Sequence, residues 1–127
     1  MNILFALHLN WGLSHCGCLK ADQLAKDNGH TVFHAFTGRE GSLAEQLQKE
    51  RQIDVLFVSL SPKDICEYIS LARKLYPEIW IIGQDPGWRL GREIPYEVFY
   101  EAGLSEVVGL GDSFVVEAMQ RLIDKQK

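Results

Sequence analysis

The sequence predicts an α/β fold in which a parallel β-sheet of five strands lies between two layers of helices. Short apolar segments and amphipathic segments alternate from one end of the chain to the other. Two of the apolar segments, residues 3–7 and 55–60, are hydrophobic almost throughout, which is typical of strands buried on both faces. Glycines such as Gly29 and Gly103 follow helical segments, at the position where a left-handed residue ends a helix.

Each strand is expected from its own short hydrophobic run. The second run mixes polar with apolar residues, which suits the edge of a sheet. The fourth and fifth runs are short and follow helical segments directly. The strands are therefore expected at residues 3–7, 31–36, 55–60, 79–82 and 106–108.

The helices are expected from their caps and apolar stripes. Ser61 can cap the third helix, and Pro62 suits its first turn. The stripe expected to face the sheet consists of Ile65, Ile69, Ala72 and Leu75. Asp112 or Ser113 caps the last helix, whose inward residues are expected to be Val116, Met119 and Ile123. The other helices are expected at residues 16–28, 42–51 and 96–102.

Strict alternation of strands and helices leaves few topologies, because crossovers between parallel strands are right-handed. The expected strand order is 2-1-3-4-5, a three-layer flavodoxin-like (Rossmann-like) sandwich. We find no linker or internal repeat, so residues 1–127 are expected to form a single domain.

Composition excludes several classes of protein. Hydrophobic residues make up 46% of the chain and the formal net charge is −4, with no basic stripe, so nucleic-acid binding is not expected. No segment is long enough to span a membrane, and no charged leader precedes the first strand. Three cysteines cannot form a disulfide framework, which favours the cytoplasm.

A binding site is expected where the chain connections reverse direction, between the carboxyl ends of the first and third strands. Four segments meet there, and glycine is present in three of them: residues 9–15, 59–61, 83–87 and 109–112. Glycine allows a ligand to approach the backbone closely, although tight turns need it as well. The Gly109-x-Gly111 turn is not a dinucleotide fingerprint, because it does not follow the first strand.

In the order and spacing of its segments the chain resembles the cobalamin-binding domain superfamily, above all the domains at the front of radical-SAM enzymes. The matching segments are residues 2–7, 19–32, 54–61 and 101–112. The resemblance implies a cobalamin cofactor whose lower-ligand tail faces Ser59 and Ser61, with Gly83, Gly109 and Gly111 making room for it. The implied cofactor-binding residues are Asn10, Gly12, Ser14, His15, Ser59, Leu60, Ser61, Gly83, Gln84, Gly109, Gly111 and Asp112.

The first loop departs from the members of that family that ligate cobalt through Asp-x-His-x-x-Gly. His15 is the one candidate cobalt ligand, but Leu13 takes the place of the aspartate and Cys18 that of the glycine. Without a carboxylate to orient its far nitrogen, His15 is a poorly supported ligand. Binding without a protein ligand to cobalt is the easier expectation, and loss of the cofactor stays open.

The rival resemblance is to response-regulator receiver domains, which share this topology. Active receivers need an acidic pair after the first strand, a phosphoacceptor aspartate at the end of the third and a lysine after the fifth. Here those places hold His8-Leu9-Asn10, Ser59 and Leu110. Phosphoryl transfer through Mg²⁺ needs the missing carboxylates. An active receiver is therefore excluded, and a degenerate one that cannot be phosphorylated is the alternative.

Other chemistry is weakly supported. His15, Cys16 and Cys18 lack the four ligands and spacing of a structural zinc site, and C-x-x-C is absent. No activated nucleophile or base stands out, so the chain is not expected to be an enzyme on its own. Trp11 and Trp88, in loops at the carboxyl end of the sheet, predict a face for a protein partner. The leading interpretation is a stand-alone cobalamin-binding-like module that serves as carrier, sensor or partner subunit.

Overall fold

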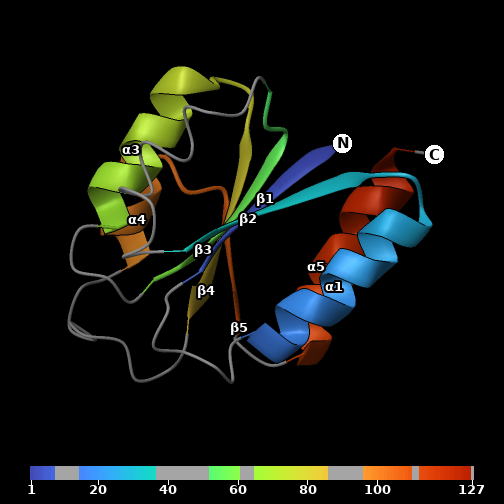
Figure 1. Cartoon of the computed structure of the whole chain (residues 1–127). Helices are drawn as coiled ribbons and strands as arrows, with labels where there is room; N and C mark the ends of the chain where they lie inside the picture. The colour runs from blue at the N-terminus through green and yellow to red at the C-terminus, as the bar shows by residue number, and fades with distance from the viewer. Residues whose placement is uncertain (8–14, 37–51, 61–64, 86–95, 110–111, 127) are drawn as a thin grey trace.

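The computed structural model confirms the predicted sheet and its order. It describes residues 1–7, 15–36, 52–60, 65–85, 96–109 and 112–126. Five parallel strands lie in the order β2-β1-β3-β4-β5, which places β2 at one edge and β5 at the other (Figure 1). The strands are β1 (Asn2–Leu7), β2 (Thr31–Phe36), β3 (Val55–Ser59), β4 (Trp80–Asp85) and β5 (Glu106–Gly109).

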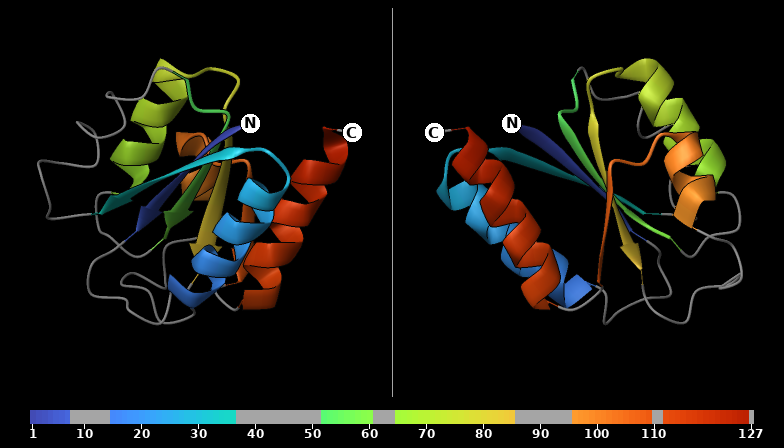
Figure 2. Two further views of the ribbon diagram at one scale, coloured as in Figure 1. Left: turned by 45° about the vertical axis from the view of Figure 1, so that its right-hand side comes forward. Right: turned by 180° about the vertical axis from the view of Figure 1, so that it is seen from behind.

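Helices cover both faces of this sheet. The helices in the described part of the chain are α1 (His15–Asp27), α3 (Ile65–Leu75), α4 (Tyr96–Ala102) and α5 (Asp112–Lys125). Helices α1 and α5 lie side by side on one face, and α3 and α4 lie on the other (Figure 2). The helix expected at residues 42–51 falls outside the described residues, as does the start expected for the third helix at Ser61.

Two hydrophobic clusters fill the spaces between the three layers. On the α3 and α4 side, Leu4 and Leu56 of the sheet pack with Ile69 of α3. On the other side, Phe5 and Phe57 are buried in one cluster with residues of α1 and α5, and their rings stack with centroids 4.7 Å apart. Neighbouring strand residues thus contribute to opposite clusters, and both are apolar because both faces of β1 and β3 are buried.

The helical stripes differ in part from prediction. Leu75, the last residue of α3, is 40% exposed, and Tyr68 is buried in its place. On α5 Val115 is fully buried, whereas the expected Val116 is partly exposed. In both helices the buried residues include positions i, i+3, i+4 and i+7, the spacing that keeps side chains on one face of a helix. The expected stripes began one residue late on α5 and reached too far on α3.

Arg73 joins α3 to the strands beside it. Its guanidinium group donates to the backbone oxygens of Pro77, Ile79 and Gly103, at 2.9, 2.6 and 2.7 Å, and to Ser105 Oγ at 3.2 Å. Gly103 has a φ of +124°, the left-handed conformation expected where α4 ends. One side chain therefore fixes the turns that precede β4 and β5.

His34 is partly buried on β2. Its ring stacks on Phe5 with centroids 5.5 Å apart, and its Nε2 lies 3.0 Å from Asp22 Oδ2. Asp22 is buried on α1 and also lies 3.1 Å from Lys26 Nζ. The aromatic stacking and the polar contact explain how a histidine is accommodated on this strand. Among the helices that the structure describes, none combines the length and hydropathy of a membrane span.

Candidate functional site

The carboxyl edge of the sheet is where the sequence placed a site, and the strand register brings several predicted residues together there. Ser59, the last residue of β3, pairs with Gln84 of β4, and Asp85 pairs with Gly109 of β5. His15 and Asp112 are the first residues of α1 and α5. The remaining predicted residues, Asn10, Gly12, Ser14, Ser61 and Gly111, lie outside the described residues.

A core side chain fills the space beside Gly83. A Cβ atom built on this glycine would lie 2.8 Å from Leu60 Cδ2 and 3.0 Å from both Cγ and Cδ1. Leu60 itself is only 1% exposed, and its backbone N–H donates to the carbonyl of Gln84 at 3.0 Å. Leu60 therefore fills the space on the side of Gly83 where a side chain would lie.

The space beside Gly109 is filled in a similar way from the other face of the sheet. A Cβ atom there would lie 2.7 Å from Cδ2 of Phe114, a residue in the first turn of α5. Phe114 is 53% exposed, so its ring covers the glycine while facing solvent on its other side. The glycines at this edge thus accommodate two side chains of the protein.

A polar contact ties the end of β4 to α4. The Tyr96 hydroxyl donates to Asp85 Oδ2, so the last residue of β4 is joined to the first residue of α4. Beside Asp85, Gln84 is only 2% exposed. Among the described residues, we find no group of three or more His, Cys, Asp and Glu side chains that could hold a metal ion.

Two side chains on α3, those of Cys66 and Tyr68, have shifted pKa values, but neither is activated for nucleophilic attack. Burial raises the pKa of the Cys66 thiol, which is partly buried against the core. Burial, followed by the nearby Tyr76, raises the pKa of Tyr68 as well. Both groups stay protonated at neutral pH, whereas a nucleophilic thiol needs a lowered pKa.

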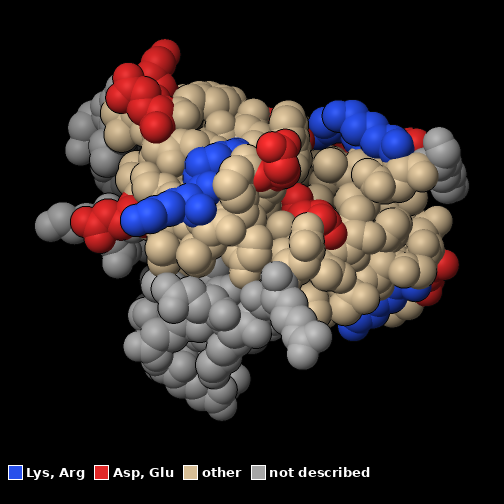
Figure 3. All heavy atoms as spheres, turned by 90° about the horizontal axis from the view of Figure 1, so that it is seen from above, with Lys and Arg blue, Asp and Glu red and all other residues tan. Residues whose placement is uncertain are grey.

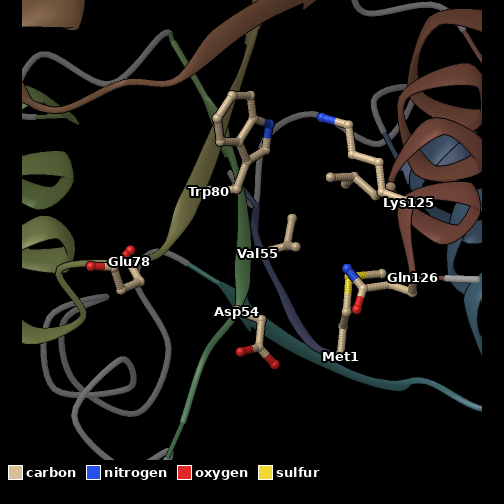
Figure 4. A pocket seen from close by; sticks show the side chains of 8 residues that line it. Met1, Asp54, Val55, Glu78, Trp80, Lys125 and Gln126 are labelled. Atoms are coloured by element: carbon tan, nitrogen blue, oxygen red, sulfur yellow. The ribbon is translucent and has the colours of Figure 1, made fainter.

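A second candidate site lies at the opposite, amino end of the strands, and the sequence did not reveal it. A groove of about 400 Å³ runs between the sheet and the end of α5, and its lining includes Asp54, Val55, Glu78, Trp80, Leu122 and Lys125 (Figure 4). Acidic and basic side chains are interspersed over this end of the molecule (Figure 3). Trp80 lies in the apolar run of the fourth strand, yet it is 39% exposed.

No protein-family model and no curated protein matches the sequence. Solved structures do match. An orphan response regulator of H. pylori has a TM-score of 0.66 and 16% identity, with 100% of this chain and 97% of that chain covered. The chain has the fold of a receiver domain. A pilus assembly-related protein from Burkholderia pseudomallei has a TM-score of 0.64 and 18% identity, with 98% and 90% covered. A CheY-like protein from Pseudomonas aeruginosa has a TM-score of 0.60 and 16% identity, with both chains covered completely.

These findings correct the expected resemblance to cobalamin-binding domains. The matching structures are receiver-like, so both the proposed membership of that superfamily and the cobalamin cofactor are wrong. Without a cobalamin cofactor, His15 has no cobalt ion to ligate. The physical reason for the error is that strand order, loop glycines and small polar residues at strand ends come with the shared topology. Leu60 and Phe114 occupy the space next to Gly83 and Gly109.

Proposed function

We propose that this protein is a receiver-like signalling or interaction domain that works without phosphorylation. The observation that carries the proposal is Ser59 at the carboxyl end of β3, where an active receiver has its phosphoacceptor aspartate. Formation of an acyl phosphate needs that carboxylate, and the Mg²⁺ ion that assists it needs further oxygen ligands. The sequence supplies His8-Leu9-Asn10 and Leu110 in place of the other required residues.

Such a domain would act by contact with another protein. In this proposal the loops of Trp11 and Trp88 form part of the docking face, as the sequence suggested. Both tryptophans lie outside the described residues, so support comes from α4, the described helix that follows the second loop in the chain. The Tyr96–Asp85 hydrogen bond attaches the start of α4 to the sheet. The exposed side chains of Val98 and Tyr100 give α4, the helix that follows that loop in the chain, an apolar surface.

The proposal has two further parts, which concern the domain organisation and the cellular location. We propose that residues 1–127 act as one domain, because the sheet and both hydrophobic clusters draw on segments from the whole chain. We also place the protein in the cytoplasm, which is consistent with its odd number of cysteines and with a free Cys66 thiol. Catalysis, where it occurs, would belong to the partner.

Incubation with acetyl phosphate and Mg²⁺, followed by intact-mass spectrometry, tests the proposal. We expect no added phosphoryl group on the protein, while an active receiver in the same reaction gains one. The variant Ser59→Asp restores one carboxylate only, and we expect it to stay unmodified because the acidic pair and the lysine are still missing. An acid-stable or acyl phosphate on the unmodified sequence would refute the proposal.

A further inference from the structure

Trp80 presents one face of its indole ring at the amino end of the sheet. The edge of the ring is held in place, because Nε1 donates to Glu106 Oε1 at 2.9 Å. The other oxygen of that carboxylate accepts from Arg121 Nη2 at 3.0 Å. A ring fixed at its edge and 39% exposed offers a preorganised aromatic surface to a ligand.

The ring already contacts a cation. Lys125 Nζ lies 5.4 Å from the centroid of the Trp80 ring, within the range of a cation–π interaction. Lys125 is the last residue of α5, and its exposed side chain extends toward the ring in Figure 4. The contact shows that a cation can lie over this ring, and an ammonium on a flexible, exposed stem is a weak and readily displaced occupant.

Two carboxylates add to the attraction for cations. Asp54 and Glu78 line the groove on the side away from α5 (Figure 4). Asp54 is held by the backbone N–H of Asn2, which donates to Oδ2 at 2.8 Å. Glu78 is exposed, and Val55 is a buried apolar residue of the lining. The groove thus combines an aromatic face, an apolar residue and two carboxylates with two cationic groups, the ammonium of Lys125 and the amino group of Met1, which lies 2.7 Å from His30 Nδ1.

We propose that this groove binds an arginine-containing basic segment of a partner protein, and that one guanidinium group displaces Lys125 from Trp80. Guanidinium is planar and weakly hydrated, so it stacks on an indole better than ammonium does. A second arginine of the same segment would be attracted by Asp54 and Glu78. The inference rests on the proposed interaction role and specifies which kind of partner segment binds. It does not depend on the absence of phosphorylation.

Titration with a short capped peptide that contains two arginines tests the inference. The matched control is the same peptide with both arginines replaced by citrulline, which keeps the shape and loses the charge. The readout is the Trp80 indole N–H resonance in a ¹H–¹⁵N spectrum, assigned by its loss in Trp80→Leu. We expect a saturable shift with the arginine peptide and none with the citrulline peptide.

Two variants make the test specific to displacement. Lys125→Gln removes the internal competitor, so the arginine peptide should bind about two- to five-fold more tightly. Glu78→Gln should weaken binding, and far-UV circular dichroism checks that all variants are folded. A Trp80 resonance that stays in place, an equal shift with citrulline, or weaker binding to Lys125→Gln would overturn the inference. Arginine amide that binds as tightly as the peptide would overturn the assignment to a protein segment. In any of these cases a negative phosphorylation result would still leave the proposed function standing.

Discussion

Leu60 lies against Gly83 at the carboxyl ends of β3 and β4, so closely that a methyl group on the glycine would be 2.8 Å from Leu60 Cδ2. Leu60 is only 1% exposed and belongs to the hydrophobic cluster under α3 and α4. A side chain in an exposed loop could move away from an added methyl group, but Leu60 is enclosed by the hydrophobic core. The Leu60 side chain therefore occupies space at the carboxyl edge of the sheet, where related folds bind ligands.

Gly83→Ala should destabilise the protein by about 1–3 kcal/mol, because the added methyl group overpacks a region that cannot relax. Urea denaturation of the variant measures the loss. The double variant Gly83→Ala/Leu60→Val makes room for the methyl group and should be more stable than the sum of the two single changes predicts. Strictly additive effects would mean that Leu60 is not the obstructing side chain.

Gly109→Ala should cost less than about 1 kcal/mol, although the built contact of 2.7 Å is even shorter. The obstructing ring belongs to Phe114, which is 53% exposed and can turn toward solvent. The same urea denaturation compares the two alanine variants directly. A cost for Gly109→Ala equal to or above that for Gly83→Ala would show that Phe114 is as firmly held as Leu60.

Arg73→Lys should destabilise the protein by about 2 kcal/mol or more, since one ammonium group cannot reach all the acceptors that the guanidinium group satisfies. Those acceptors lie on the turns before β4 and β5 and include the carbonyls of Ile79 and Gly103. The matched control is Arg121→Lys, which alters an exposed pair with Glu106 and should cost less than about 1 kcal/mol. Equal losses in thermal or urea denaturation would contradict the bracing role of Arg73.

Hydrophobic periodicity was enough to predict the fold of this chain. Continuous apolar runs located the strands, and the number and spacing of strands and helices then limited the topology to the order that the structure confirms. It was harder to predict which helix residues face the sheet, because a run such as Val115-Val116 is apolar at both positions. Only the orientation of α5 on the sheet decides which valine is buried.

The site could not be predicted to the same degree. A glycine in a sequence indicates that something lies close to the backbone, but it does not say what. At Gly83 and Gly109 the neighbours are Leu60 and Phe114, and no local pattern identifies contacts of this kind in advance. The groove at the amino end was missed for a related reason: Trp80, Glu106 and Lys125 are distant in sequence and meet only in the folded protein.

The lowered pKa of His30 predicts how the stability of the protein depends on pH. Burial, and then the positive charge of the Met1 amino group, lower the pKa of His30 in the folded protein. The unfolded chain therefore binds a proton more readily, so this residue's contribution to stability is retained above pH of about 6.5 and lost as the pH falls below it. Urea midpoints at pH 7.5 and pH 5.5 should differ less in His30→Gln than in the unmodified protein. An equal or larger difference in the variant would contradict the prediction.

The most direct test of a receiver fold without phosphoryl chemistry is a ¹H–¹⁵N spectrum recorded before and after addition of Mg²⁺ and beryllofluoride, a mimic of the phosphoryl group. We predict that the amide resonances of Ser59, Gln84 and Gly109, at the carboxyl edge of the sheet, keep their positions throughout the titration. Saturable shifts at these three residues would show that the edge binds the metal and the phosphoryl mimic, and would contradict the account.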